Sequence, residues 1–155
     1  MISEIILSAN LVIALLNGFT GSLEDAKVFM CKTNTECSKL AEAAYFEARG
    51  ESTKGVKAVM KVILNRKNKD GFPNTIKGVV NQPYAFSYLM NDRVMRNNKE
   101  VAQWRRMYIL AFDMLTKKKD IDMKGATHYH TVNVHPKWAK HLKKVATVGN
   151  HVFYK

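Results

Sequence analysis

The sequence lacks the motifs that mark several common enzyme chemistries. It has no Gly-x-Ser-x-Gly turn, no phosphate-cradling glycine loop, no His-Glu-x-x-His motif and no paired Cys-x-x-Cys motif. These absences argue against serine nucleophiles, phosphate-loop enzymes and the usual zinc sites. Its two cysteines, Cys31 and Cys37, both lie in the N-terminal quarter, and nothing near them suggests a cysteine nucleophile.

Acidic residues are also scarce, with 13 Asp and Glu against 25 Lys and Arg, so the net charge is +12. A field of this sign favours polyanions such as nucleic acid, anionic lipid or the acidic polymers of a bacterial envelope, without choosing among them. At 155 residues and 46% hydrophobic content, the chain can form one domain with a buried core. We find no repeat, low-complexity segment or internal linker.

The N-terminal region contains one apolar stretch, Ile5 to Leu16. It is shorter than the roughly 20 residues that span a bilayer, but its length suits a secretory signal. Glu4 precedes it without any Lys or Arg, and no Ala-x-Ala site follows. We expect export to the periplasm, envelope or extracellular space, with an uncleaved signal-anchor or an ordinary packed helix as alternatives. The chain then divides into residues 1–30 and a main domain, residues 31–155.

Hydrophobic periodicity predicts an α+β domain that is mainly helical, with a small antiparallel sheet at its C-terminal end. A capping box at Thr33-x-x-Glu36 opens the first helix. The predicted helices run from Thr33 to Ala48, from Ser52 along an apolar face to Leu64, and near Ile76 to Asn81. Asn98 can cap a further long helix, whose apolar positions are Val101, Trp104, Tyr108, Ala111 and Leu115. A strand is expected at 126–132, and Gly149-Asn150 predicts a hairpin joining strands 144–148 and 151–154. In an exported chain, Cys31 and Cys37 could form a local disulfide; two reduced thiols are the alternative.

Glu47 lies on the apolar face of the first helix, with Leu40, Ala43, Ala44 and Ala48 at helical spacing. A carboxylate on an inward face is costly unless it is paired or protonated. Because desolvation raises a carboxyl pKa, this position suits a general acid. The alternative is that Glu47 pairs with a basic residue such as Arg49 and only stabilises the fold.

Glu51 follows Glu47 by four residues. On a continuous helix the two carboxylates would be neighbours, as in a two-carboxylate glycosidase. Gly50 interrupts such a helix, so we favour a role for Glu51 at the turn, orienting the loop or hydrogen-bonding to the site. A single buried acid can still cleave a glycosidic bond if a substrate hydroxyl is the nucleophile.

Two other segments carry candidate functional side chains. The stretch from Gln82 to Tyr88 combines amide, hydroxyl and aromatic groups, as sugar-binding loops do, although Phe86 could instead belong to the core. His128-x-His130, together with His135, His141 and His151, allows a zinc site, but we favour cleft or surface histidines and expect no metal and no cofactor.

The assembled segments resemble the SleB-like cell-wall hydrolases, a family that includes bacterial spore cortex-lytic enzymes and related phage proteins. The resemblance covers about residues 40–154 and is carried by four blocks in order: Leu40–Glu51; Val62–Arg66; Phe72–Val80 with Gln82-Pro83 and Phe86-Ser87; and Gly125–Phe153. It implies that residues 31–155 form a lysozyme-like domain acting on peptidoglycan, with Glu47 as general acid. It also implies a lytic transglycosylase, which cleaves between N-acetylmuramic acid and N-acetylglucosamine as the muramyl 6-hydroxyl closes onto C1.

Under this interpretation Glu51 supports the turn, and we expect five residues to line the glycan cleft: Gln82, Phe86, Ser87, His128 and Tyr129. Attack by water, which would make the protein a muramidase, is the first alternative. A zinc-dependent N-acetylmuramoyl-L-alanine amidase using His128 and His130 is the second. A nucleic-acid-binding module and an enzymatically silent glycan-binding protein are less favoured.

Two departures from the family pattern bear on substrate binding. Phe46 stands where members often have glycine, which predicts a narrower cleft beside the acid. We expect no separate peptidoglycan-binding domain beside the main domain, and the positive field could serve instead. The expected partners are peptidoglycan glycan strands and anionic envelope polymers, without nucleic acid. We expect a monomeric enzyme of phage lysis (an endolysin) or of bacterial wall remodelling.

Overall fold

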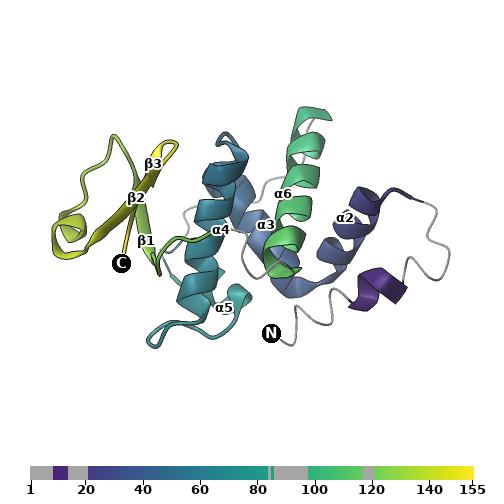
Figure 1. Ribbon diagram of the computed structural model, residues 1–155, viewed down its shortest axis with the longest axis horizontal. Coiled ribbons are helices and arrows are strands. Elements are labelled where there is room, and N and C mark those ends of the chain that lie inside the picture. The colour runs from purple at the N-terminus through teal and green to yellow at the C-terminus, as the bar shows by residue number, and fades with distance from the viewer. Residues whose placement is uncertain (1–8, 14–20, 84, 86–97, 117–120) are drawn as a thin grey trace.

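The computed structural model describes residues 9–13, 21–83, 85, 98–116 and 121–155 (Figure 1). The helices are α2 (Leu23–Thr33), α3 (Thr35–Ala48), α4 (Thr53–Lys67), α5 (Ile76–Val80) and α6 (Asn98–Thr116), and the strands are β1 (His128–Thr131), β2 (Lys144–Val148) and β3 (His151–Tyr154). A short 3₁₀ helix, Lys137–His141, precedes β2. The predicted fold class, mainly helical with a small C-terminal antiparallel sheet, is confirmed.

Helix α3 lies at the centre of the helical part and packs against α2, α4, α5 and α6. Its face of small and apolar residues, among them Leu40, Ala43, Ala44 and Ala48, is buried as the periodicity predicts. Helices α2 and α6 lie at one end of the molecule, the sheet lies at the other, and α4 runs between them (Figure 1). The last turn of α3 therefore belongs to the middle of the molecule.

Helix α4 follows the sequence pattern closely. Ser52 is its N-cap, and the Ser52 hydroxyl accepts a hydrogen bond from the Gly55 N–H at 3.2 Å. The predicted apolar face is buried throughout: Val56, Val59, Met60, Ile63 and Leu64. At its other end, the Asn65 amide donates to the Ala126 carbonyl at 2.8 Å and Arg66 Nε donates to the Thr127 carbonyl at 2.7 Å. These two bonds attach the segment leading into β1 to the helical part.

The predicted capping box at Thr33 and Glu36 is wrong. Thr33 is the last residue of α2, and Asn34 caps α3 by accepting from the Cys37 N–H at 2.9 Å. The Glu36 carboxylate instead accepts from the Ile76 N–H at 2.5 Å and from the N–H of the next residue. A carboxylate is stabilised at a helix N-terminus, so Glu36 serves α5, which is distant in sequence and adjacent in space.

Helix α6 departs from its predicted limits and apolar face. Asn98 is its first residue rather than its cap, and Val101 is 52% exposed although its spacing suggested burial. Trp104 is half-buried and stacks on Tyr45 of α3 with ring centroids 4.1 Å apart. Because α6 packs against both α2 and α3, its buried surface is wider than one stripe and centres on Met107, Ala111 and Leu115.

The N-terminal part of the described chain is tied to the rest by a disulfide. Cys31 near the end of α2 bonds to Cys37 in α3, which settles the alternative left open by the sequence. The expected boundary after residue 30 falls inside α2, which packs against α6. No helix within the described ranges is both long and apolar enough to cross a membrane. Most of the apolar stretch 5–16 lies outside those ranges.

The sheet has the order β1-β3-β2, and both pairs are antiparallel. The Gly149-Asn150 hairpin between β2 and β3 is confirmed, with Gly149 at φ +56°. A positive φ strains most L-residues, so glycine fits this turn. Strand β1 is shorter than predicted and pairs Tyr129 with Phe153 and Thr131 with His151. This register decides which side chains face the helices.

Candidate active site

Glu47 lies in the last turn of α3, at the junction between the helices and the sheet, and is half-buried. The Tyr129 hydroxyl on β1 donates a hydrogen bond to Glu47 Oε2 at 3.1 Å. The two residues are 82 positions apart in the chain. Folding therefore brings the predicted acid and one of the predicted cleft residues together.

The Glu47 carboxyl group is not paired with a basic side chain in the part of the protein that the structure describes. Arg49, the suggested structural partner, instead places its guanidinium 4.9 Å from the centre of the Tyr45 ring. Burial raises the pKa of Glu47, and the hydrogen bond from Tyr129 opposes part of that rise. A raised pKa favours the protonated form that a general acid requires.

Glu51 occupies the turn between α3 and α4, and its side chain is 10% exposed. Its Oε2 accepts from the Asn150 N–H at 3.3 Å, and its Oε1 lies 3.7 Å from His151 Nδ1. A Cβ atom on Gly149 would overlap Glu51 Oε2. Glu51 therefore contacts the tip of the β2–β3 hairpin, and this contact fixes the sheet against the turn that follows Glu47.

Tyr129 is held in place by the rings around it. The His151 ring meets it edge to face at a centroid distance of 5.2 Å, and the Phe153 ring lies at 5.7 Å. His151 is 5% exposed, and burial lowers its pKa, which favours the neutral ring. Its Nδ1 has no hydrogen-bond partner in the described part of the chain. Sequence reasoning considered His151 only as a metal ligand and missed its packing on Tyr129.

His128 and His130 contact a different set of residues. Successive strand residues point to opposite faces of a sheet, so these two rings face away from the side on which Tyr129 meets Glu47. Both lie near Trp138, at centroid distances of 5.4 and 5.7 Å, and His130 Nε2 is 2.9 Å from the Tyr154 hydroxyl. Among the residues that the structure describes, no three His, Cys, Asp or Glu side chains form a group that could hold a metal ion.

The remaining predicted cleft residues are only partly covered by the structure. Gln82 is half-buried in the turn after α5. Phe86 and Ser87 lie outside the described residues. Phe46, the departure from the family pattern, packs its ring against Tyr45 at 5.1 Å and against Trp104 at 5.9 Å. Its ring is thus part of the contact between α3 and α6.

Two arginines support the site without having been predicted to do so. Arg106 on α6 donates to the Glu51 carbonyl at 3.0 Å and to the Arg49 carbonyl at 3.4 Å, which holds the turn after Glu47. Arg66 places its guanidinium 5.5 Å from the centre of the Phe72 ring, beside the start of β1. Arg66 belongs to the sequence block Val62–Arg66, but the pattern of that block does not reveal that its side chain binds the segment leading into β1.

Residues 50–154 match the family model described as Cell Wall Hydrolase, and the chain belongs to this family. A spore cortex-lytic enzyme from Halalkalibacterium halodurans is 31% identical over 122 residues, which cover 78% of this chain and 35% of the relative. One from Bacillus subtilis is 39% identical over 71 residues, covering 46% of this chain and 23% of the relative. The chain thus corresponds to well under half the length of these relatives.

Two solved structures share the fold. The catalytic domain of the Bacillus cereus SleB protein aligns with a TM-score of 0.59 and 28% identity, covering 76% of this chain and 88% of that domain. The catalytic domain of the germination-specific lytic transglycosylase SleB from Bacillus anthracis gives 0.60 and 28%, covering 76% and 92%. The resemblance inferred from the sequence is confirmed, and the fold is lysozyme-like. Because the family match begins at residue 50, the role of Glu47 is argued from its geometry.

Proposed function

We propose that this protein degrades peptidoglycan by cleaving the bond between N-acetylmuramic acid and N-acetylglucosamine, with Glu47 as the general acid. The observation that carries the proposal is the half-buried Glu47 carboxyl, which accepts a hydrogen bond from Tyr129 and has no described cation beside it. Membership of the cell wall hydrolase family supports the substrate class.

In the proposed reaction, Glu47 gives its proton to the glycosidic oxygen as the bond to muramyl C1 breaks. The positive charge that develops at C1 is met by the muramyl 6-hydroxyl. Glu47, now a carboxylate, takes the proton of that hydroxyl as the 6-oxygen bonds to C1. The products are a 1,6-anhydromuramyl end and a free N-acetylglucosamine hydroxyl, and Glu47 ends protonated as it began. Tyr129 holds Oε2, which leaves Oε1 to transfer the proton.

The position of Glu51 favours this route over a two-carboxylate mechanism. A hydrolase of the latter kind uses its second carboxylate as nucleophile or to activate water. Here both oxygens of Glu51 face the hairpin, at Asn150 and His151. Glu51 is therefore proposed to support the turn and its local field, and the substrate's own hydroxyl is proposed as the nucleophile.

We further propose that the protein acts outside the cytoplasm, in the periplasm, envelope or extracellular space. The Cys31–Cys37 disulfide supports this location because such bonds persist mainly in oxidising compartments. Peptidoglycan, the proposed substrate, also lies there. The apolar segment 5–16 is the candidate export signal.

The test is mass spectrometry of soluble products from purified peptidoglycan, digested with the wild type, with Glu47→Gln and with Glu42→Gln. Glu42 is a matched control because it lies on the same helix and pairs with Lys39 instead of facing Tyr129. We expect Glu47→Gln to lower the rate by on the order of 10²- to 10⁴-fold, the usual contribution of a general acid. Glu42→Gln should retain the wild-type rate.

The product masses distinguish a transglycosylase, a muramidase and an amidase from one another. Fragments lighter by one water than reducing muropeptides, absent with Glu47→Gln, would establish the transglycosylase. Reducing muramyl ends would identify a muramidase that uses the same acid. Free peptides with intact glycan, or a folded Glu47→Gln protein that keeps most of its activity, would overturn the proposal, and the former would favour an amidase.

A further inference from the structure

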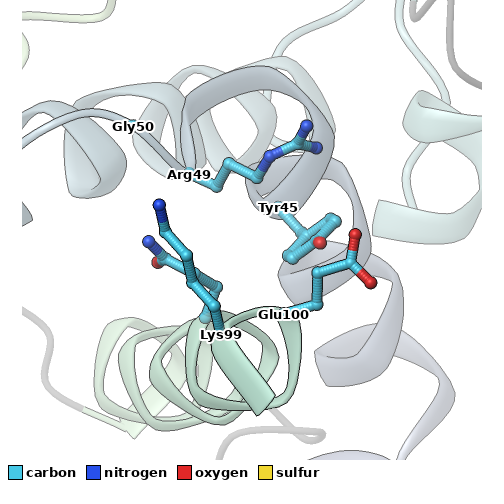
Figure 2. Close-up of a pocket in the computed structure, with 6 residues that line it drawn as sticks. Tyr45, Arg49, Gly50, Lys99 and Glu100 are labelled. Carbon is cyan, nitrogen blue, oxygen red and sulfur yellow. The ribbon is translucent and has the colours of Figure 1, made fainter. Parts of the chain in front are cut away.

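A pocket of about 300 Å³ opens between the end of α3 and the start of α6 (Figure 2). It is lined by Tyr45, Arg49, Gly50, Lys99, Glu100 and Gln103. In Figure 2 the Lys99 side chain extends from α6 toward Arg49 and Gly50, and Arg49 lies above Tyr45. The proposed mechanism assigns no role to this pocket.

The pocket presents two basic side chains, Arg49 and Lys99, without an acidic partner in direct contact in the described part of the protein. Both side chains are exposed. The ring of Tyr45 forms a firm wall, since it is 5% exposed and stacked on Trp104. An arginine and a lysine facing one opening suit a carboxylate or a phosphate.

Two acceptor groups in the same pocket select between these anions. Gln103 Oε1 is buried and has no hydrogen-bond partner within the described ranges, so it is available to accept a hydrogen bond from an N–H or O–H group of a ligand. Glu100 adds a negative charge to the lining, which opposes a polyanion. A peptide with a free carboxylate offers both an anion and N–H donors, whereas a phosphodiester group offers only acceptors.

The position of the pocket relates it to the proposed catalytic acid. Arg49 and Gly50 follow Glu47 by two and three residues, within one helical turn. Since each residue of a helix advances by about 100°, Tyr45 and Arg49 lie on the side of α3 away from Glu47. A ligand in the pocket would therefore lie on the other side of α3 from Glu47, away from a bond that Glu47 cleaves.

We propose that this pocket binds a carboxylate of the peptide attached to the muramyl units of peptidoglycan. This inference rests on the proposed function for its substrate. The pocket would hold the peptide with Arg49 and Lys99 while the glycan strand meets Glu47 around the end of α3. Lys99 and Arg49 are then specificity-determining residues that favour glycan bearing peptides over bare glycan.

The first experiment measures peptide binding to the Glu47→Gln protein, which separates binding from cleavage. The probes are a synthetic stem peptide with free carboxylates and the same peptide with its carboxylates amidated, followed by calorimetry. We expect the peptide with free carboxylates to bind more tightly than the amidated peptide. Lys99→Gln and Arg49→Gln should each weaken the binding of the free-carboxylate peptide by about fivefold, as for the loss of one exposed charge pair. Lys77→Gln is the control, because Lys77 is exposed near the opposite end of α3.

Equal affinity for both peptide forms, or an unchanged affinity in Lys99→Gln, would overturn the inference. Tight binding of poly(glycerol phosphate) that depends on Lys99, with no binding of the peptide, would overturn it in favour of an envelope phosphate polymer. Circular dichroism establishes that each variant is folded. The binding measurement does not depend on whether Glu47 is the catalytic acid.

The second experiment compares kcat/KM on glycan strands with and without their peptides. The ratio of the two values is expected to fall by about fivefold in Lys99→Gln and to keep its wild-type value in Lys77→Gln. An unchanged ratio in Lys99→Gln would contradict the inference. If neither the wild type nor any variant cleaves the glycan strand, the proposed function fails. The binding experiment then tests by itself whether the pocket binds a peptide carboxylate.

Discussion

At the scale of single residues, the contribution of the hydrogen bond from Tyr129 to Glu47 can be tested without changing Glu47. Tyr129→Phe keeps the ring between His151 and Phe153 and removes the donor. The hydrogen bond stabilises the carboxylate, so its loss should raise the pKa of Glu47 further. We expect the alkaline limb of the kcat/KM profile to move to higher pH, with a rate loss of about tenfold from poorer positioning.

The measurement is the pH dependence of glycan cleavage by the wild type, Tyr129→Phe and Tyr154→Phe. Tyr154 is a matched control because its hydroxyl meets His130 instead of Glu47. An alkaline limb that stays in place or moves to lower pH in Tyr129→Phe would contradict the role given to this hydroxyl.

The raised pKa of Glu47 also predicts how stability depends on pH. The folded protein keeps the Glu47 proton to a higher pH than the unfolded chain, whose pKa lies near 4.5. Stability therefore falls as the pH rises from that value through the folded pKa, because the buried group must ionise. Glu47→Gln removes this cost at neutral pH. In acid the carboxyl group is protonated in both the folded and the unfolded protein, so the substitution changes stability little through this effect.

Thermal unfolding checks this expectation. At about pH 7 Glu47→Gln should melt on the order of 1–3 °C above the wild type, and at about pH 3.5 the two should coincide. Glu42→Gln, whose carboxylate is paired with Lys39, should show no such gain. A Glu47→Gln protein that is less stable than the wild type at neutral pH would mean that the carboxylate is favourably held.

At the scale of elements, the contact between Glu51 and the β2–β3 hairpin predicts a coupling between two substitutions. Gly149→Ala places a Cβ against Glu51 Oε2 and forces alanine into a positive φ, so we expect a loss of about 1–3 kcal/mol. Glu51→Ala removes the overlap but not the backbone strain. The loss caused by Gly149→Ala should thus be smaller in the Glu51→Ala background.

Urea unfolding of the four proteins in this double-mutant cycle gives the coupling energy, expected at about 0.5 kcal/mol or more. Gly71→Ala serves as a control, since Gly71 also has a positive φ but no atom lies within 4 Å of the place that its Cβ would take. Additive losses for Gly149 and Glu51 would show that the hairpin does not depend on this contact.

The elements themselves were largely predictable, because their signals are local. The apolar face of α4, its Ser52 cap and the Gly149-Asn150 turn each depend on residues a few positions apart. The inward position of Glu47 was likewise visible in the spacing of α3. Such patterns are visible in the sequence because a helix face, a cap or a turn depends on residues that are close together in the chain.

The rest depended on contacts between distant segments. Glu36 caps a helix 40 residues away, and Tyr129 reaches Glu47 across 82 residues. Whether His128 or Tyr129 faces the acid is set by the register of β1 on β3, and a shift of one residue would exchange them. The sequence could therefore name the candidate residues of the site, but it could not say which of them meet.

At the scale of the whole molecule, the site lies where two parts of the fold join. The helices form one side and the sheet the other, and Glu47 and Tyr129 come from opposite sides of this junction (Figure 1). Asn65, Arg66 and Glu51 fasten the sheet to the helices close to the same place. A glycan strand that reaches Glu47 would therefore contact both parts.

The net charge of +12 acts on a longer range than any of these contacts. Its effect should be screened by salt, since the Debye length falls from about 14 Å at 0.05 M to about 6 Å at 0.3 M. We expect the protein to bind anionic cell-wall sacculi less as salt rises through this range, while kcat on short soluble glycan fragments changes by less than about twofold.

Cosedimentation with purified sacculi, compared with turnover of soluble fragments at the same salt concentrations, measures the two effects. Lys137→Gln with Lys140→Gln lowers the net charge from +12 to +10 by changing two exposed residues of the 3₁₀ helix, remote in sequence from Glu47. This variant should bind sacculi more weakly at low salt and show a shallower salt dependence, because fewer charges contribute to the attraction. Binding that is independent of both salt and these lysines would mean that the protein is held to the wall by its cleft alone, and the positive surface would then have no part in retaining the enzyme on its substrate.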